Sequence, residues 1–248
     1  MSGDWESYMG QLNDAPANFL VDLGLLDQAP LPGSLDLLMI QIDLPQPTEE
    51  GLPSEADFDF LEKIEESIIE SITQKVEGTY VGAVTSQGTH TMAFYFTKRD
   101  GSEADVEKAM SAIDGVEWGA QVESDAPWSF YFDVLAPSPE QMRFIGDARL
   151  VEQLEEAGDK LSTPRDVEHS AFFETADDRT AFVEAVKPLG FAVTGTEDDA
   201  DEDLPFGLEL VRKHSVELDT VFGITSQLDE LATGHNGMYD GWQTGLVK

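Results

Sequence analysis

The side chains best suited to binding or chemistry lie on two strand-like segments in the C-terminal half of the chain. Period-two alternation places Arg165 and His169 on one face of the first segment, among apolar residues. It places Arg212 and His214 on one face of the second segment. Cations are rare here, with 14 Lys and Arg against 50 Asp and Glu, so a cluster of imidazole and guanidinium groups would be a distinctive surface.

The two segments are expected to be antiparallel neighbours in the middle of one sheet. If Phe173 lies opposite Leu208, His169 comes close to Arg212 on a shared face. One interpretation is a small patch that contacts a ligand or a partner. The other is a polar rim, or a core histidine with satisfied hydrogen bonds, at one end of an apolar sheet.

The C-terminal tail carries a second candidate surface, formed by Tyr239, Asp240 and Trp242 around a glycine. Aromatic residues in a final strand typically close the core and its edge. Tyr and Trp also dominate binding hot spots, so an exposed aromatic anchor is the alternative. All seven residues, from Arg165 to Trp242, are therefore candidates for partner binding.

The sequence contains no motif for catalysis, metal binding or cofactor binding. It has no phosphate-binding loop, no Gly-x-Gly-x-x-Gly and no Gly-x-Ser-x-Gly. The lack of cysteine excludes disulfides and thiolate metal ligands, and the four histidines lack metal-ligand spacing. We therefore expect a protein that is not an enzyme, with no catalytic residue, no metal and no cofactor.

Hydrophobic periodicity predicts the elements that position these residues. Residues 35–123 show the order strand, helix, strand, strand, helix, strand, and residues 165–242 repeat it. This is the split βαβ plan, an antiparallel sheet with two helices on one face. The sequence therefore predicts an α+β protein with two ferredoxin-like domains. A further strand is predicted at residues 128–134, from the alternation of Trp128, Phe130, Phe132 and Val134.

Helix starts are marked by a Ser or Thr followed three residues later by an acid or amide, a pattern that satisfies free N–H groups of the first turn. The four pairs are Ser54/Asp57, Ser102/Asp105, Ser138/Gln141 and Thr175/Asp178. The helix after Ser138, residues 139–157, is expected to join the two domains. The predicted domains are therefore residues 1–157, including this linking helix, and residues 158–248.

Charge is the most unusual property of the chain, with a formal net charge of -36. Residues 1–136 hold 26 acids and 5 bases, and residues 137–248 hold 24 acids and 9 bases, so the excess is spread evenly. We interpret this as adaptation to a salt-loving cell, because the Debye length falls to about 3 Å at molar salt. The alternative is an acidic mimic of nucleic acid that blocks a nuclease. The charge argues against binding nucleic acid or anionic membranes directly.

The N-terminus shows neither a basic region nor an apolar stretch, and no apolar run approaches the roughly 20 residues that span a bilayer. A cytoplasmic location without membrane contact is the expectation.

Three segments of the C-terminal half resemble the RraB family, regulators of ribonuclease E activity. They are the tail Tyr239-Asp240-Gly241-Trp242, the strand Asp-Val-Glu-His-Ser-Ala-Phe-Phe at residues 166–173, and the turn Leu189-Gly190-Phe191. The resemblance covers about residues 158–248. It departs from the family at Gln243, where the family usually has Gly.

The first part resembles the uncharacterised domain often found before RraB, and no activity follows from that resemblance. The residues that carry it are Trp5, Tyr8, Pro53, Glu55, Asp125, Trp128, Tyr131, Leu135 and Pro137.

The resemblance implies a split βαβ fold and a non-catalytic regulator that binds and modulates a ribonuclease E-like enzyme by protein–protein contact. It leaves the oligomeric state open. The alternative function is a small-molecule binding or sensing module, whose pocket the aromatic residues Tyr80, Phe94, Trp118 and Trp128 would line if they are not core.

Overall fold

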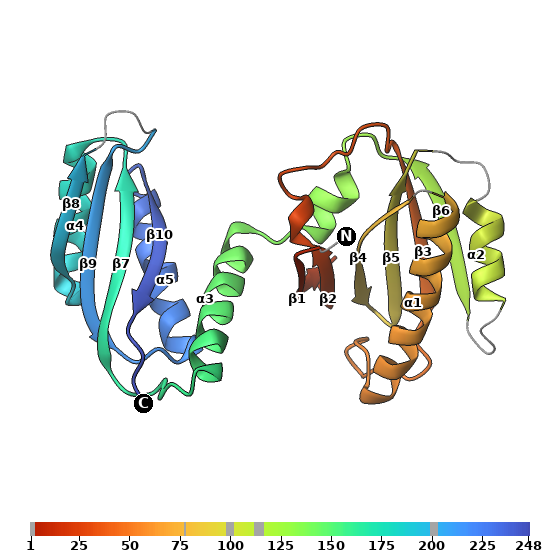
Figure 1. Ribbon diagram of the computed structural model, residues 1–248, viewed down its shortest axis with the longest axis horizontal. Coiled ribbons are helices and arrows are strands. Elements are labelled where there is room, and N and C mark those ends of the chain that lie inside the picture. The colour runs from red at the N-terminus through yellow and green to blue at the C-terminus, as the bar shows by residue number, and fades with distance from the viewer. Residues whose placement is uncertain (1–2, 77, 98–101, 112–116, 199–202) are drawn as a thin grey trace. The chain divides into compact units, whose positions relative to one another are not determined.

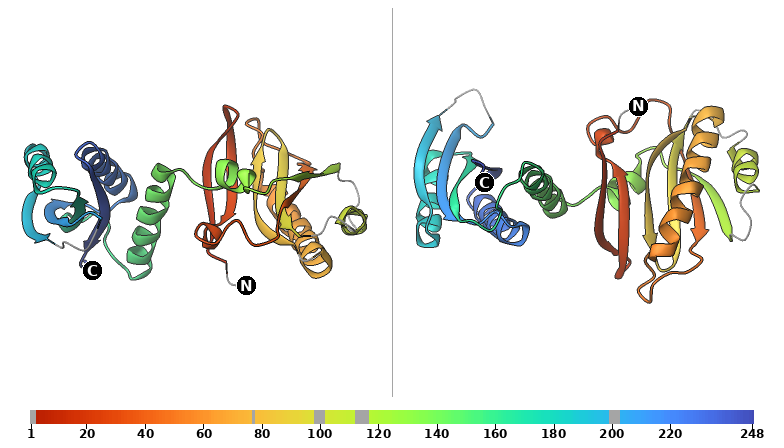
Figure 2. Two further views of the ribbon diagram at one scale, coloured as in Figure 1. Left: turned by 90° about the horizontal axis from the view of Figure 1, so that it is seen from above. Right: turned by 60° about the horizontal axis from the view of Figure 1, so that its bottom comes forward.

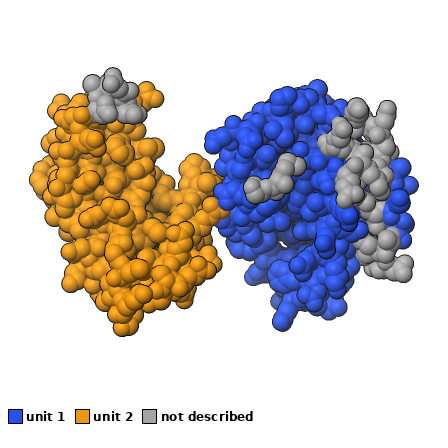
Figure 3. Space-filling model, viewed as in Figure 1, with its two compact units in different colours: residues 1–136 blue, residues 137–248 orange. Residues whose placement is uncertain are grey.

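The protein consists of two compact units, residues 1–136 (unit 1) and residues 137–248 (unit 2), coloured separately in Figure 3. A computed structural model describes residues 3–76, 78–97, 102–111, 117–198 and 203–248. Each unit has one antiparallel sheet and its own helices (Figure 1). The α+β class and the two ferredoxin-like units predicted from the sequence are confirmed.

Unit 1 contains the predicted split βαβ motif and a hairpin in front of it. The motif runs β3 (Asp36–Asp43), α1 (Glu55–Val76), β4 (Thr79–Ser86), β5 (Thr89–Phe96), α2 (Ser102–Met110), β6 (Trp118–Ser124). The hairpin is β1 (Trp5–Leu12) and β2 (Ala15–Asp22), followed by the 3-10 turn η1 (Leu23–Leu25). Because β2 pairs with β4, the hairpin extends the sheet to the order β1-β2-β4-β5-β3-β6.

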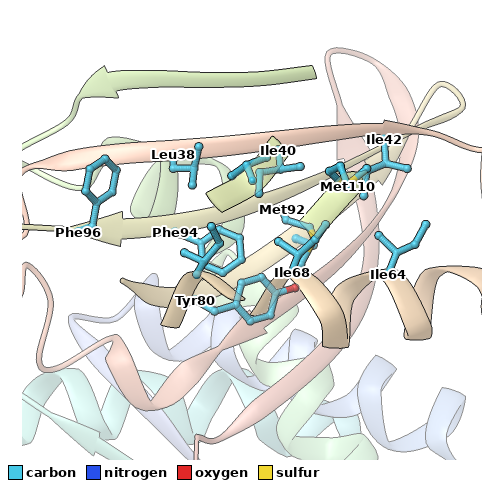
Figure 4. Close-up of a cluster of buried hydrophobic side chains, with 13 residues drawn as sticks. Leu38, Ile40, Ile42, Ile64, Ile68, Tyr80, Met92, Phe94, Phe96 and Met110 are labelled. Atoms are coloured by element: carbon cyan, nitrogen blue, oxygen red, sulfur yellow. The ribbon is translucent and has the colours of Figure 1, made fainter. Parts of the chain in front are cut away.

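One face of this sheet is closed by helices α1 and α2. Alternate residues of β3, namely Leu38, Ile40 and Ile42, are fully buried against the helix layer (Figure 4). Helix α1 contributes Ile64, Ile68 and Ile72 to this core, each one turn from the next. The aromatic rings of Tyr80 on β4 and Phe94 on β5 belong to this core.

The opposite face is covered by a π-helix, η2 (Phe130–Leu135), where the sequence predicted a strand over residues 128–134. The strand prediction is wrong, because the buried residues follow helical spacing: Trp128, Tyr131 and Leu135 are all fully buried. Trp128 adopts φ 60, and the carboxylate of Asp125 accepts hydrogen bonds from Ser129 N and Phe130 N, which starts a helical turn. The period-two pattern of aromatics was coincidental.

Unit 2 has the same plan. Its elements are α3 (Pro139–Glu156), β7 (Arg165–Phe173), α4 (Ala176–Val186), η3 (Lys187–Leu189), β8 (Ala192–Asp198), β9 (Phe206–His214), α5 (Leu218–Thr233), β10 (Gly237–Thr244). The sheet order is β10-β7-β9-β8, and the views within Figure 2 show α4 and α5 on one face of it. Phe173, Phe182 and Leu228 are buried in the layer between.

Helix α3 clusters with unit 2, whereas the sequence prediction placed the domain boundary after this helix. The reason is side-chain contact: Arg143 of α3 forms an ion pair with Asp229 of α5, and Asp147 of α3 binds Thr225 of α5. The predicted helix start is confirmed, because Ser138 and Gln141 form a complete capping box.

Two other predicted helix starts are also borne out by side-chain contacts. Thr175 accepts a hydrogen bond from Asp178 N, and the Asp57 carboxylate accepts from both Ser54 N and Ser54 Oγ. The pair Ser102/Asp105 lies outside the residues whose side chains are described.

Candidate partner-binding groove

The register of the two central strands of unit 2 differs from the predicted one. Ala171, not Phe173, lies opposite Leu208, and Val167 lies opposite Arg212. The prediction was wrong by two residues, because alternation fixes which residues share a face but not how far one strand slides along the other. His214 pairs with Arg165, yet its side chain reaches His169, with 3.2 Å between the two Nε2 atoms.

Arg212 lies near His169 but has its own partners. It donates a hydrogen bond to Leu189 O at 3.2 Å, and its guanidinium lies 4.4 Å from the ring centre of Phe191. Within the described parts of the chain, no hydrogen bond joins His169 and Arg212. A role for Arg212 and His169 in partner binding stays a prediction.

Arg165 is a buried residue that binds the chain's own C-terminal segment. Its guanidinium pairs with both carboxylate oxygens of Asp159, at 2.6 and 2.7 Å, and also donates to Lys160 O and Gly245 O. Asp159 in turn accepts from Val247 N. The Arg165 guanidinium is therefore bound by groups of its own chain, and Arg165 has a structural role.

A series of hydrogen bonds runs through the core from Tyr239 through His169 and His214 to Ser215. The acceptor at the Ser215 end determines which nitrogen of each imidazole carries a hydrogen. Ser215 O can only accept, so His214 Nδ1, at 2.7 Å, carries a proton. Neutral His214 then accepts at Nε2 from His169 Nε2. His169 Nδ1 is left as an acceptor, and the Tyr239 hydroxyl, at 2.8 Å, donates to it.

This assignment requires both imidazoles to be neutral, and burial enforces that. Burial, followed by the charges of His214 and Arg212, lowers the pKa of His169 to about 3. Burial also lowers the pKa of His214. A proton on His214 would place hydrogens on both facing Nε2 atoms, and a proton on His169 would occupy Nδ1, the atom that accepts from Tyr239.

Unit 2 should consequently lose stability as the pH falls below about 6.5, because unfolded His169 binds a proton there and folded His169 does not. Between pH 7 and pH 5 we expect His169 to account for a loss of about 2 kcal/mol in the free energy of unfolding. The measurement is denaturant unfolding of the full chain at both pH values, with hydrogen exchange followed in β7 and β9.

The variant His169→Gln should remove most of that decline, whereas Ser170→Ala, one residue along the same strand, should keep it. An equal pH dependence in wild type and His169→Gln would contradict the assignment.

The tail segment owes its geometry to a β-bulge between Tyr239 and Gly241. Residues three apart in a regular strand point to opposite faces, yet Tyr239 pairs with Ala171 and Trp242 pairs with His169, which share the helix-covered face. Asp240 is the inserted residue and is exposed. Gly241, at φ 132, adopts a backbone conformation that favours glycine, which explains this residue in the tail.

Asp147 of α3 completes the site, and the sequence analysis missed it. It accepts hydrogen bonds from Trp242 Nε1 at 2.8 Å and from Thr225 Oγ1 at 2.6 Å, and it is only 5% exposed. Burial raises the pKa of its carboxyl, and these two hydrogen bonds and the charge of Arg143 act against that rise. One acid among 50 carries no sequence signal; only its place beside an apolar helix stripe could have marked it.

These residues form a groove between α3, α5 and β10 with a volume of about 470 Å³. Its walls include the tail residues Tyr239, Asp240 and Trp242, the ion pair of Arg143 and Asp229, and Asp147. The groove therefore joins three of the predicted partner-binding residues with acidic side chains of two helices.

Over the described parts of the chain, no group of three or more His, Asp or Glu side chains is arranged to hold a metal ion. Within the same parts, no helix is long and apolar enough to cross a membrane.

Comparison with protein families assigns both units. A model of a family of unknown function, DUF695, matches residues 3–136, more than half of the chain. The chain belongs to the DUF695 family. A model of the RraB family, described as regulator of ribonuclease activity B, matches residues 145–244. The architecture inferred from the sequence, an RraB domain preceded by an uncharacterised domain, is thus confirmed, and most residues that line the groove fall within the match to RraB.

No curated protein matches the chain. Among solved structures, an unknown protein from Galdieria sulphuraria has 7% identity and a TM-score of 0.23, covering 83% of this chain and 96% of its own. A putative glycine cleavage system transcriptional repressor has 8% identity and a TM-score of 0.24, covering 85% and 98%. Likenesses this weak carry no functional argument.

Proposed function

We propose that this protein is a non-catalytic regulator that binds a ribonuclease E-like enzyme and changes its rate of RNA cleavage. The observation that carries the proposal is the match of residues 145–244 to regulator of ribonuclease activity B. It implies a protein partner and a site of action in the cytoplasm, where RNA is degraded.

The charge of unit 2 supports a protein partner over RNA. The unit carries 24 acids and 9 bases, and it therefore has few cations with which to release the counterions of phosphate groups. An acidic surface attracts the basic, RNA-binding parts of a nuclease, and this attraction weakens as salt rises.

The direct test is cleavage of a fluorogenic RNA by a ribonuclease E-type enzyme from the same cell, at the salt concentration of that cell. Adding the full chain should lower or redirect cleavage in a saturable way, and the two proteins should co-elute in gel filtration. A ribonuclease of an unrelated class is the control and should be unaffected. Absence of both a complex and a rate change would contradict the proposal.

The alternative, a small-molecule site in unit 1, rests on a groove of about 440 Å³ at one end of its sheet. Trp118, Gln41 and Thr91 are among the residues that line it. The other three aromatics considered for such a pocket, Tyr80, Phe94 and Trp128, are buried in the core. The groove is lined largely by polar side chains, which differs from the mostly apolar pocket that a sensing module predicts.

A further inference from the structure

Two hydrogen-bond donors that line the groove of unit 2 are already bound to acceptors within the protein. The Tyr239 hydroxyl donates to His169, and the indole N–H of Trp242 donates to Asp147. Both rings line the groove. These two side chains can still present a ligand with aromatic surface and with the acceptor lone pairs of the Tyr239 oxygen.

The charges of the groove are likewise one-sided. Arg143 is neutralised by its ion pair with Asp229. Asp147 is buried under Trp242, and Asp240 projects from the bulge as an exposed carboxylate. Three carboxylates therefore surround one guanidinium. An anionic or acceptor-rich ligand would find repulsion here and few free donors.

We propose that this groove receives an arginine side chain of the partner protein, with the guanidinium stacked on Trp242 and Tyr239 and hydrogen-bonded to Asp240. Arginine fits better than lysine, because its planar guanidinium stacks on aromatic faces and forms paired hydrogen bonds with a carboxylate. The inference rests on the proposed function, and it names the chemistry of the partner segment that the RraB domain binds.

Two features of the fold hold the groove ready for this ligand. The bulge turns Tyr239 and Trp242 to the same face and leaves Asp240 at its mouth. The buried chain through His169 and His214 fixes the Tyr239 hydroxyl as a donor toward the core, so that its oxygen remains an acceptor. Pre-organised groups of this kind lower the ordering cost of binding.

The test uses the full chain and a fluorescently labelled peptide with two arginines separated by glycine, at an ionic strength of about 0.1 M. The control peptide replaces each arginine with citrulline, which has a similar shape but no charge. We expect saturable binding of the arginine peptide only, and a lysine peptide should bind several-fold more weakly.

Variants locate the site. Asp240→Asn should weaken binding about tenfold, and Tyr239→Phe should weaken it by a smaller factor. The matched control is Asp177→Asn, which removes one exposed carboxylate from α4, outside the groove. Equal losses for Asp240→Asn and Asp177→Asn would overturn the inference in favour of diffuse acidity, and so would equal binding of the citrulline peptide.

The ribonuclease assay separates this inference from the proposed function. If wild type and Asp240→Asn regulate the nuclease equally, the function stands and the groove is not its contact. If the arginine peptide binds in the groove but the nuclease is neither bound nor regulated, the groove inference stands and the proposed function fails.

Discussion

Replacement of Arg165 by methionine is expected to lower the free energy of unfolding of unit 2 by about 4 kcal/mol. The side chain of Asp159 is fully buried in the ion pair, so the substitution leaves an uncompensated charge in the interior. It also removes the donors to Lys160 O and Gly245 O, and with them the anchor of the C-terminal segment. Denaturant unfolding of the full chain, with hydrogen exchange in β7 as a local probe, measures the loss.

The matched control is Lys187→Met, which also removes one cation from an ion pair. Lys187 and Glu184 are both more than half exposed, so this change should cost less than about 0.5 kcal/mol. If the two variants lose equal stability, the buried pair does not hold unit 2 together. The double variant Arg165→Met/Asp159→Asn should recover part of the loss, because it removes the stranded charge as well.

The pH dependence of this pair has a definite sign. The hydrogen bond from Arg165 is the main reason that the pKa of Asp159 lies below its ordinary value. A depressed carboxyl pKa stabilises the fold above the ordinary value and loses that contribution as the pH falls through the lowered one. Arg165→Met should therefore cost most at neutral pH and less in acid, where the Asp159 carboxylate is protonated.

Replacement of Asp125 by alanine is the second large expected effect, a loss of about 3 kcal/mol from unit 1. Its carboxylate accepts from Tyr95 Oη at 2.5 Å, from Ser129 N at 2.8 Å and from Phe130 N at 3.0 Å. Tyr95 is fully buried and stacks on Trp128, with ring centres 4.0 Å apart. Alanine would leave these donors without a charged acceptor and release the start of η2.

The near-ultraviolet circular dichroism of the stacked Tyr95–Trp128 pair reports this change directly, alongside denaturant unfolding. Asp133→Ala is the control, because Asp133 lies exposed on the same π-helix and should change stability by less than about 0.5 kcal/mol. If Asp125→Ala behaves like this control, the carboxylate is not what starts η2.

Burial of Asp125 acts to raise its pKa, but hydrogen bonds from Phe130 N, Tyr95 and Ser129 outweigh burial and hold the pKa below its ordinary value. The contribution of Asp125 to stability is therefore complete at neutral pH and disappears in acid as the carboxylate is protonated.

The sequence predicted those features of the fold that depend on local pattern. Alternation of apolar residues identified β3, β7 and β9, and Ser or Thr followed by an acid or amide identified the starts of α3 and α4. These patterns report which side of an element faces a core, and the order of elements then left few topologies to consider. The hairpin of β1 and β2 lies outside the predicted split βαβ motif, and β1 is an edge strand with little burial to impose a pattern.

The candidate site depended more on tertiary structure. The tail residues Tyr239, Asp240 and Trp242 were found from the sequence, because aromatic pairs around a glycine are rare enough to notice. The sequence did not predict that Tyr239 and Trp242 point to the same face, because this depends on a one-residue bulge where β10 pairs with β7. Asp147 joins them because α3 packs against α5 and β10 within unit 2.

By itself, the sequence determined the acidity, the order of helices and strands, the lack of cysteine chemistry, and the resemblance of the chain's second half to a regulator family. Each of these follows from residue types or from short-range spacing. Only the tertiary structure decided that His169 meets His214 rather than Arg212, that residues 130–135 form a helix, and that Arg165 is buried. The physical reason is that strand register, bulges and buried ion pairs depend on contacts between residues far apart in the chain, whose energies local patterns do not encode.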